Sequence, residues 1–498
     1  MPENNSQYTR PPVVAIMGHV DHGKSTLLDT IRHANTVDSE AGGITQHVSA
    51  YEVEHTTPEG IVKKITFIDT PGHAAFQTIR SRSASIADIA ILIVAADDGV
   101  KPQTVQAWQT IQENKVPYLV AINKIDKPGA DIDKCIRELM EMGVYLEGYG
   151  GDVSYAKISA KKGTGIEDLL ETILLLSEFI DLSYNPSVAA SGFVIESHID
   201  SKRGIAATLL IKDGILNKSD YVVNGCSIVP CRAIYNFKGK PIESATVCEP
   251  VTLYGFSEQC IAGEMFTTHP DKQSAEEEAA KCDATVRIMD EVPTSNEMNI
   301  VPVLVKCDVN GSIDAIVSEI RKHSTERVFF KIVHAAVGAI SEADIRMVSR
   351  DESPIIIGFN VTVDPKARDM DESKRVTIQL FDIIYRMSEW LEEVAEDKKF
   401  RKKVDSVIGT GQILKVFSQD KDQTLIGVRV ASGEFKIKDT FRIIRSREEV
   451  MRGKVISMQA GKSTMTKVEE GTDCGMMVQL KELPRQFDLI EAITQIEG

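Results

Sequence analysis

The feature that most constrains the fold is a glycine-rich stretch between an apolar run and a run of helix-forming residues. Residues 13–17 read VVAIM, and the eight residues that follow read GHVDHGKS. This pattern, placed between a buried strand and a helix, is typical of a loop that wraps around phosphate groups. Glycines allow the backbone to approach the ligand closely, and the N–H groups at the start of the helix face its negative charge. The sequence therefore predicts a phosphate-binding loop at the edge of a parallel α/β sheet.

Each part of this loop has an expected role toward a nucleotide. The Lys24 side chain reaches the terminal phosphates, and the Ser25 hydroxyl is a ligand for Mg²⁺. The nucleotide-binding residues predicted here are Gly18, His19, Val20, Asp21, His22, Gly23, Lys24, Ser25 and Thr26.

A second motif, Asp69-Thr-Pro-Gly72-His73, follows the strand-like run ITFID. A carboxylate at this strand end suits the Mg²⁺ site, and the Gly72 N–H can respond to the γ-phosphate. His73 is the predicted catalytic residue, because it stands where a side chain can orient the attacking water. Thr45, in the glycine-containing run AGGIT, is typical of a first switch loop. The predicted metal-binding set is Ser25, Thr45 and Asp69.

Two further motifs predict which base the nucleotide carries. Asn123-Lys124-Ile-Asp126 follows the run YLVAI, and Ser159-Ala160-Lys161 follows later in the chain. The Asp126 carboxylate can accept hydrogen bonds from guanine N1 and N2, a donor pair that adenine lacks. We expect Asn123 to tie this loop to the phosphate loop, the Lys124 stem to stack on the base, and the Ala160 N–H to face guanine O6. The expected ligands are therefore GTP and Mg²⁺.

Composition limits the other possibilities. The formal net charge of −16 argues against a protein that coats nucleic acid over its whole surface. Residues 403–498 hold 15 basic and 14 acidic side chains, so this segment is the better candidate for an RNA contact. None of the 8 cysteines forms a CxxC pair, and we expect them to be reduced and mostly buried. No apolar run reaches the ~18–20 residues of a membrane span, and the start has no signal pattern, so we expect a cytoplasmic protein without a membrane partner.

Strand and helix patterns along the chain predict a multidomain protein of the α/β and β classes. It would combine a GTPase parallel sheet with two small β-barrels, a small α/β/α layer domain and a long linking helix. The expected order is an N-terminal tail at 1–10, the GTP-binding domain at 11–182, a β-barrel at 185–272, a linker helix at 273–296, the α/β/α domain at 297–370, the linking helix at 374–402 and the C-terminal β-barrel at 403–498.

The runs GHVDHGKSTLLDTIR, EAGGITQHV, DTPGHAAF, AADDGVKPQT and NKIDKP resemble translation initiation factor 2 of the bacterial type. The resemblance covers nearly the whole chain after residue 11. It implies a monomeric GTPase, stimulated by the ribosome, that contacts both subunits, places or protects initiator tRNA and promotes subunit joining. GTP hydrolysis would act as the release switch. Family members often carry long N-terminal extensions, whereas about ten residues precede the first predicted strand here.

The last domain departs from the family pattern. In this family it holds the formyl-methionine end of the tRNA, with a basic-basic-aromatic run shortly before a Gly-Xaa-Glu-Cys-Gly turn. This chain keeps much of the turn at 471–475, but the run is replaced by Gln459-Ala460-Gly461, followed by one basic residue, and Val428 stands where the family has Cys. Either the pocket is rebuilt from groups such as Lys436, Arg442, Arg445 and Lys462, or recognition is weakened, which we favour. The candidate tRNA-binding residues are Lys436, Lys462, Cys474 and Gly475.

Three alternative functions remain open. The first is another translational GTPase, acting in elongation or recycling. The second is the regulatory GTPase subunit of a metabolic enzyme, as in sulfate activation, although no second catalytic motif follows residue 180. The third is a GTP-binding scaffold that does not hydrolyse, which the presence of His73 disfavours.

Overall fold

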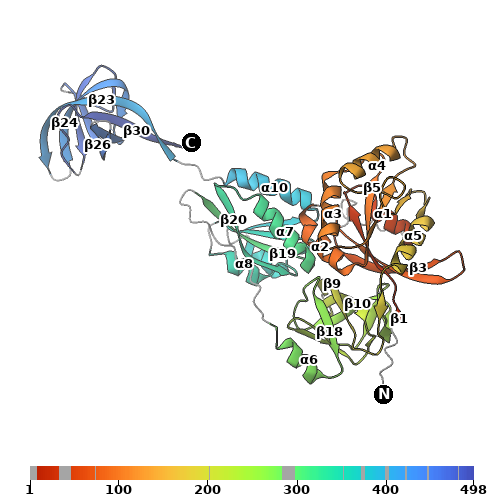
Figure 1. The fold of residues 1–498 in the computed structure, drawn as a ribbon. Helices are drawn as coiled ribbons and strands as arrows, with labels where there is room; N and C mark the ends of the chain where they lie inside the picture. The colour runs from red at the N-terminus through yellow and green to blue at the C-terminus, as the bar shows by residue number, and fades with distance from the viewer. Residues whose placement is uncertain are drawn as a thin grey trace. The chain divides into compact units, whose positions relative to one another are not determined.

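The computed structural model describes residues 8–32, 46–72, 74–200, 202–282, 298–350, 353–371, 376–398, 403–420, 423–445, 448–461, 463–480 and 482–497. The chain divides into two compact units, Met1–Lys398 and Lys399–Gly498 (Figure 1). Within the described ranges, no helix is long and apolar enough to cross a membrane.

The first unit begins with a six-stranded sheet in the order β3-β4-β2-β5-β6-β7. Its five parallel strands are β2 (Val13–Gly18), β4 (Val62–Asp69), β5 (Ile89–Ala95), β6 (Tyr118–Asn123) and β7 (Tyr155–Lys157). The antiparallel strand β3 (Ser49–Thr56) forms one edge. Strands β2 and β5 are buried along their whole length, which explains their continuous apolar sequence.

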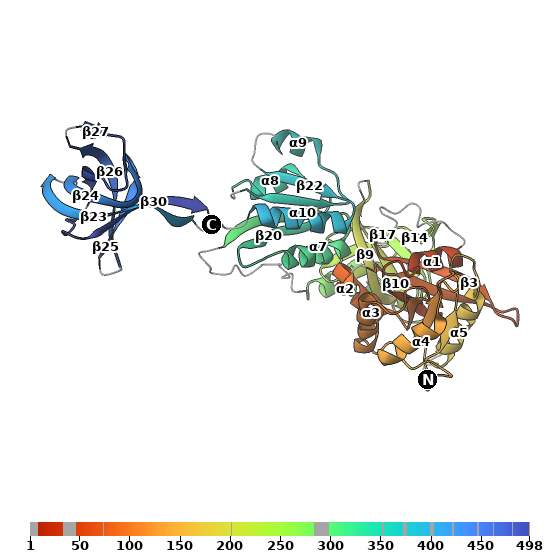
Figure 2. The ribbon, with the colours of Figure 1, turned by 90° about the horizontal axis from the view of Figure 1, so that it is seen from above.

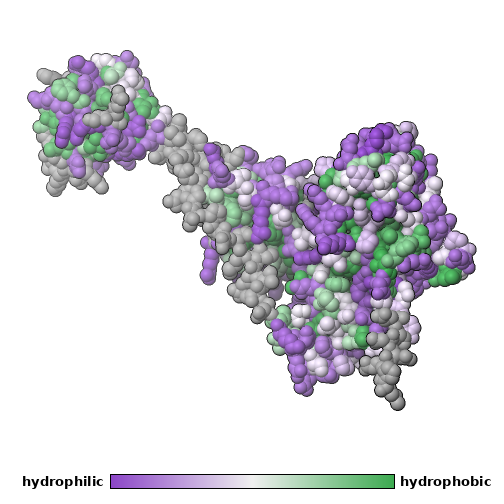
Figure 3. All heavy atoms as spheres, in the orientation of Figure 1, coloured by the Kyte–Doolittle hydropathy of each residue, from purple (hydrophilic) through white to green (hydrophobic). Residues whose placement is uncertain are grey.

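Helices cover both faces of this sheet. On one face α1 (Lys24–Arg32) and α5 (Ile166–Glu178) share a core with the strands. On the other face lie α2 (Gln77–Ile86), α3 (Pro102–Glu113) and α4 (Ile132–Glu141). The surface over α4 is drawn mainly in the hydrophilic colour (Figure 3), as expected for a helix that buries one stripe of side chains. The loops at the carboxyl ends of the parallel strands are the place for a ligand in such a sheet.

A β-barrel follows the six-stranded sheet and its helices in the same unit. Its sheet has the order β13-β12-β18-β9-β10-β17-β14-β15, and the Ser257 N–H donates to the Ile228 carbonyl, joining the end of β17 to β13. The strands are β9 (Ser191–Asp200), β10 (Gly204–Asp213), β12 (Tyr221–Asn224), β13 (Ser227–Pro230), β14 (Ile234–Asn236), β15 (Pro241–Ile242), β17 (Pro250–Phe256) and β18 (Met265–His269). Helix α6 (Lys272–Ala279) packs Ala275 and Ala279 on Val223. Residues 283–296 of the predicted linker helix lie outside the described ranges.

A largely buried ion triad joins the barrel to the six-stranded sheet domain. Asp88, just before β5, accepts from both Arg10 nitrogens at 2.6 and 2.8 Å and from Lys212 of β10 at 2.8 Å. Burial opposes ionisation of Asp88, but the hydrogen bonds and charges of these two cations hold its pKa below the usual range. The carboxylate also accepts from the Val13 N–H at 2.8 Å, so it ties the start of β2 to the barrel.

The expectation that all cysteines are reduced is wrong in this structure. Cys226, in the turn between β12 and β13, is bonded to Cys282, which follows α6. The other six cysteines are free and buried, as expected for small apolar side chains. Sequence spacing could not reveal this pair, because the two residues are 56 positions apart.

The last part of the first unit is a three-layer α/β/α domain. Four parallel strands, in the order β20-β19-β21-β22, are β19 (Asn299–Cys307), β20 (Val328–Val337), β21 (Ile355–Phe359) and β22 (Thr377–Phe381). Helices α7 (Asn310–Lys322) and α10 (Ile384–Asp397) pack on one face. Helices α8 (Glu342–Val348) and α9 (Pro365–Asp371) lie together on the other face (Figure 2).

The predicted single helix over 374–402 is wrong in its first part. Residues 377–381 form β22, which pairs with β21 from Ile355↔Thr377 to Phe359↔Phe381. The helical spacing of Ile378 and Phe381 misled the prediction, because it ignored the backbone hydrogen bonds that the exposed edge of β21 offers. The helix itself, α10, has 14 residues and buries Ile384, Met387, Leu391 and Ala395.

The second unit is a closed β-barrel. Around it run β23 (Lys403–Asp420), β30 (Leu489–Glu497), β25 (Thr440–Arg445), β26 (Glu448–Ala460), β29 (Asp473–Gln479) and β24 (Gln423–Lys436), and β24 pairs again with β23. Two short strands, β27 (Ser463–Met465) and β28 (Lys467–Glu469), pair with β26 and β24. The predicted fold class is therefore confirmed, except for the long linking helix.

Candidate functional site

The phosphate-loop motif lies between β2 and α1, as the sequence predicts. Gly23 has φ +89°, and a Cβ atom added there would lie 2.4 Å from Asn123 Nδ2. Glycine is the residue that tolerates both the positive φ and the close approach of a second loop. The loop is thus shaped by contact with the base-recognition motif as well as by its own sequence.

The Lys24 side chain is buried inside the loop. Its Nζ donates to the carbonyls of Gly18 at 3.1 Å and His19 at 2.8 Å. Burial lowers the pKa of Lys24 to about 8, although the nearby Asp69 carboxylate favours the charged form. A Cβ atom added to Gly72 would lie 2.4 Å from this Nζ, so the first two motifs meet at the ammonium group.

Asp69 ends β4 directly beside the phosphate-loop strand, in register with Ile16. It is buried, and Thr70 fixes the next turn by donating to the Ile16 carbonyl at 2.7 Å. Arg80 of α2 is also buried and donates to the Pro71 carbonyl at 3.3 Å, which sequence reasoning missed. The Ser25 hydroxyl at the start of α1 and the Asp69 carboxylate form an oxygen donor set of the kind that Mg²⁺ prefers. The residues therefore fit a nucleotide with its Mg²⁺.

Asn123 joins three of the predicted motifs. Its Nδ2 donates to the His22 carbonyl at 2.9 Å, and its Oδ1 accepts from the Ala160 N–H at 2.9 Å. This N–H was predicted to face guanine O6, so a bound base would have to share it with Asn123. Next to it, Ser159 Oγ donates to Asp126 at 2.7 Å, and this hydrogen bond holds the pKa of Asp126 below its usual range. Asp126 is therefore an oriented carboxylate at neutral pH.

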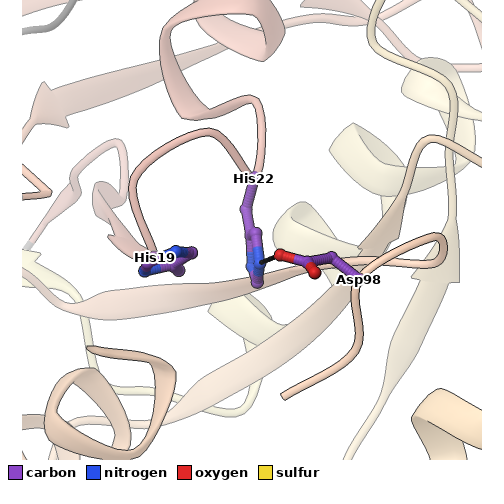
Figure 4. A group of neighbouring side chains, drawn as sticks. All are labelled: His19, His22 and Asp98. Atoms are coloured by element: carbon purple, nitrogen blue, oxygen red, sulfur yellow. Dashed lines mark ion pairs between the residues drawn. The ribbon is translucent and has the colours of Figure 1, made fainter. Parts of the chain in front are cut away.

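The two histidines of the loop face α3 and the loop after β5 (Figure 4). His19 Nδ1 lies 2.5 Å from Gln103 Oε1, which also accepts from the Val20 N–H at 3.0 Å. His22 is buried, and burial together with the neighbouring His19 lowers its pKa to about 4. Gln103 and Asp98, which lies 3.5 Å from His22, were not predicted, because no motif marks them.

Thr45, the predicted switch-loop residue, and His73, the predicted catalytic residue, lie outside the residues that the structure describes. The residue after Thr45 is described and contacts the α/β/α domain. Gln46 Nε2 donates to the Asp382 carbonyl at 2.8 Å, and Gln46 Oε1 accepts from the Ile384 N–H at 3.4 Å. This connection to the start of α10 has no signal in the sequence.

A second candidate site is a groove of about 480 Å³ on the C-terminal barrel. Cys474 and Gly475, both predicted, line it together with Lys415 and Phe417 of β23. Phe417 is 56% exposed, and Lys415 Nζ lies 5.3 Å from its ring centre. A basic and an aromatic side chain are thus present, but on a different strand from the one where the family pattern has them.

Three of the other predicted basic residues of this barrel, Lys436, Arg442 and Arg445, do not line the groove. Lys436 Nζ lies 2.5 Å from Glu434, Arg442 pairs with Glu491 at 2.8 Å, and Arg445 pairs with Asp488 at 2.6 Å. Lys462 lies outside the described ranges. The spacing argument missed Lys415 and Phe417 because it followed a single strand, whereas the groove is built from several.

Comparison with known proteins agrees with this arrangement. Family models match residues 10–178 (Elongation factor Tu GTP binding domain), 189–269 (Elongation factor G domain 2) and 273–392 (Translation-initiation factor 2). A solved structure, GDP-bound aIF5B from Aeropyrum pernix, has a TM-score of 0.50 and 24% identity over 97% of this chain and 92% of that one. That likeness supports the fold alone.

Relatives that match nearly the whole chain show which family it belongs to. Translation initiation factor IF-2 of Geobacillus sp. (strain WCH70) is 41% identical over 97% of this chain and 67% of its own length. The same factor of Anoxybacillus flavithermus is 40% identical over 98% of this chain and 68% of its own length. That of Streptococcus pneumoniae (strain P1031) is 41% identical, but this chain spans only 53% of its length. The chain therefore belongs to the translation initiation factor IF-2 family, the translational GTPases of initiation.

Proposed function

We propose that this protein works on the ribosome as a GTP-dependent switch that promotes initiation. It would contact both subunits as a monomer in the cytoplasm, support their joining around initiator tRNA and leave after GTP hydrolysis. Family membership supports the general activity. The observation that carries the nucleotide part is the buried Lys24 ammonium, which lies between two loop carbonyls and Gly72.

The nucleotide would be held by three groups of residues. Lys24 and the loop N–H groups would face the phosphates, while Ser25, Asp69 and Thr45 would hold Mg²⁺, which balances charge on the phosphate oxygens. Gly72 would face the γ-phosphate. Asp126 would select guanine, with Lys124 along the base and Ser159, Ala160 and Lys161 closing the pocket.

Hydrolysis would depend on His73, which follows Gly72 in the chain and would orient the attacking water. Because positioning of this water needs an ordered switch, we expect slow hydrolysis by the free protein and acceleration by ribosomes. His73→Ala should bind GTP like the parent protein and lose the acceleration. A variant that hydrolyses GTP at the parental rate on ribosomes would show that the role is wrong.

Ribosome association is tested separately. The protein should sediment with ribosomes in the presence of a non-hydrolysable GTP analogue and be released with GDP. The Gly129→Ala variant is a suitable control, because an added Cβ atom meets nothing within 4 Å there. Failure to sediment with ribosomes in either nucleotide state would contradict the proposal and favour a regulatory GTPase.

For initiator tRNA we propose weakened recognition through the groove of the C-terminal barrel. Phe417 offers a stacking face for the terminal base, and Lys415 offers one positive charge beside it. Three other basic residues expected at this site, Lys436, Arg442 and Arg445, are already in ion pairs. We expect low affinity for free formyl-methionyl tRNA and little discrimination against the unformylated form. Titration of the full chain with both forms tests this, and tight binding with strong preference for the formyl form would overturn it.

A further inference from the structure

A cluster of metal-binding side chains lies beside the phosphate loop, outside the Mg²⁺ position. One nitrogen from each of His19 and His22 and one oxygen of Asp98 lie within 4.8 Å of one another (Figure 4). The histidines come from the loop between β2 and α1, and Asp98 comes from the loop between β5 and α3. No step of nucleotide binding described above uses Asp98.

Hydrogen bonds fix the proton positions on both imidazole rings. The Ile93 carbonyl, 3.4 Å from His22 Nδ1, can only accept, so this Nδ1 carries the proton. Gln103 Oε1 accepts from the Val20 N–H, which identifies it as the oxygen, and His19 Nδ1 must therefore donate to it. In both rings this leaves Nε2 as the atom with a free electron pair. Histidines that bind metal commonly have their other nitrogen held in this way.

The electron pair on His22 is buried and unused. Its Nε2 has no hydrogen-bond partner among the described residues, and the side chain is only 1% exposed. Asp98 Oδ2 lies 3.5 Å from it, while Asp98 Oδ1 is held by Lys101 Nζ at 2.7 Å. Two electron-rich atoms therefore face each other, an arrangement that a cation between them would stabilise.

The separation of two of these atoms fits a specific class of ion. In a tetrahedral site with bonds of about 2.1 Å, two ligand atoms lie about 3.4 Å apart. The 3.5 Å between His22 Nε2 and Asp98 Oδ2 agrees with this distance between two ligand atoms. Two imidazoles and one carboxylate suit Zn²⁺ or a similar ion better than Mg²⁺ or Ca²⁺, which prefer oxygen. Asp98 is partly exposed, so solvent can reach the fourth position.

We propose that His19, His22 and Asp98 form a binding site for a divalent transition metal of the zinc class, distinct from the nucleotide's Mg²⁺. The ion would join the phosphate loop to the loop after β5. The simple alternative is that His22 is a buried structural histidine and that Asp98 only forms the ion pair with Lys101.

Co²⁺ is the probe, because it absorbs visible light when four-coordinate. It is titrated into the full-length, nucleotide-free protein after treatment with a chelator. We expect binding of one equivalent, with visible bands that Zn²⁺ removes and Mg²⁺ does not. Asp98→Asn should weaken binding by about tenfold or more. Asp97→Asn, which removes a neighbouring carboxylate paired with Lys127, should bind like the parent.

Two control measurements keep the test decisive. Guanine nucleotide affinity and thermal unfolding without metal should be the same in Asp98→Asn and the parent protein, which shows that the loop is intact. Equal Co²⁺ affinity in the parent and Asp98→Asn would overturn the proposal. So would absorption typical of thiolate ligands, which would place the ion on cysteine, or the absence of stoichiometric binding by the parent.

Discussion

At the scale of single residues, Asn123 joins two loops of the proposed nucleotide site. One amide bonds the phosphate loop through the His22 carbonyl and the base-recognition loop through the Ala160 N–H. The glycine at 23 leaves the space that this amide occupies. The loops proposed to bind the phosphates and the base are therefore joined by direct hydrogen bonds.

Base selection should depend on Asp126. Asp126→Asn replaces an acceptor pair with one acceptor and one donor, so guanine N1 and N2 lose partners while the O2 of xanthine gains one. We expect weaker GTP binding and preference for xanthosine triphosphate in a competition assay. Asp133→Asn, which changes an acidic residue in the first turn of α4, is the matched control. An unchanged preference for GTP would refute the role of Asp126.

The Lys24 side chain should take up a proton when the nucleotide binds. With a pKa of about 8 in the nucleotide-free protein, roughly half of the side chains are neutral at pH 8. Phosphates favour the ammonium form, so affinity should fall as the pH rises from about 7 to 9. Calorimetry at pH 8 in two buffers with different ionisation enthalpies measures the uptake. Lys24→Arg, which stays charged, should show less uptake, and equal uptake in both proteins would contradict the assignment.

The predicted nucleotide-binding motifs lie at neighbouring strand ends, because each motif joins a strand end to a loop of defined chemistry, and their binding roles stay predictions. The sequence alone indicated that Asn123 would reach the phosphate loop, and the structure has this contact. It could not identify Gln103, Asp98 or Arg80, because their roles depend on which helix packs beside the loop. His73 and Thr45 remain predictions.

At the scale of elements, Gln46, which follows the proposed switch residue Thr45 in the chain, meets the start of α10. Gln46 bonds the backbone at Asp382 and Ile384, between β22 and α10. The sequence predicted the six-stranded and the four-stranded sheet of the first unit from their apolar runs. It missed β22 because an edge strand depends on a neighbour far away in the sequence, and helical spacing over five residues cannot exclude a strand.

The Gln46 contact should carry the nucleotide signal into the α/β/α domain. In the parent protein, exchange of GDP for a non-hydrolysable GTP analogue should change amide hydrogen exchange in residues 382–387. Gln46→Ala should bind both nucleotides normally and reduce this change, because two hydrogen bonds are removed. Gln106→Ala, on α3, is a control. A change of equal size in the Gln46 variant would show that the signal takes another route.

At the scale of the whole molecule, the C-terminal barrel is a separate compact unit with its own core. Its groove should bind the tRNA end chiefly through Phe417. Phe417→Ala should weaken binding of initiator tRNA to the full chain by ~1–3 kcal/mol, the usual contribution of one stacked base. Phe487→Ala, which changes another exposed aromatic residue of the barrel, should have little effect. Equal losses in both variants would place the contact elsewhere.

The triad of Arg10, Asp88 and Lys212 limits where the chain can be cut. A fragment that starts at residue 11 removes two of the hydrogen bonds to Asp88, and one that stops at residue 182 removes Lys212, so each leaves a buried carboxylate short of a cation. Fragments of the nucleotide domain intended for expression should therefore begin before Arg10 and extend through β10. The boundary that the sequence pattern suggests between the first two domains is a poor place to divide this protein.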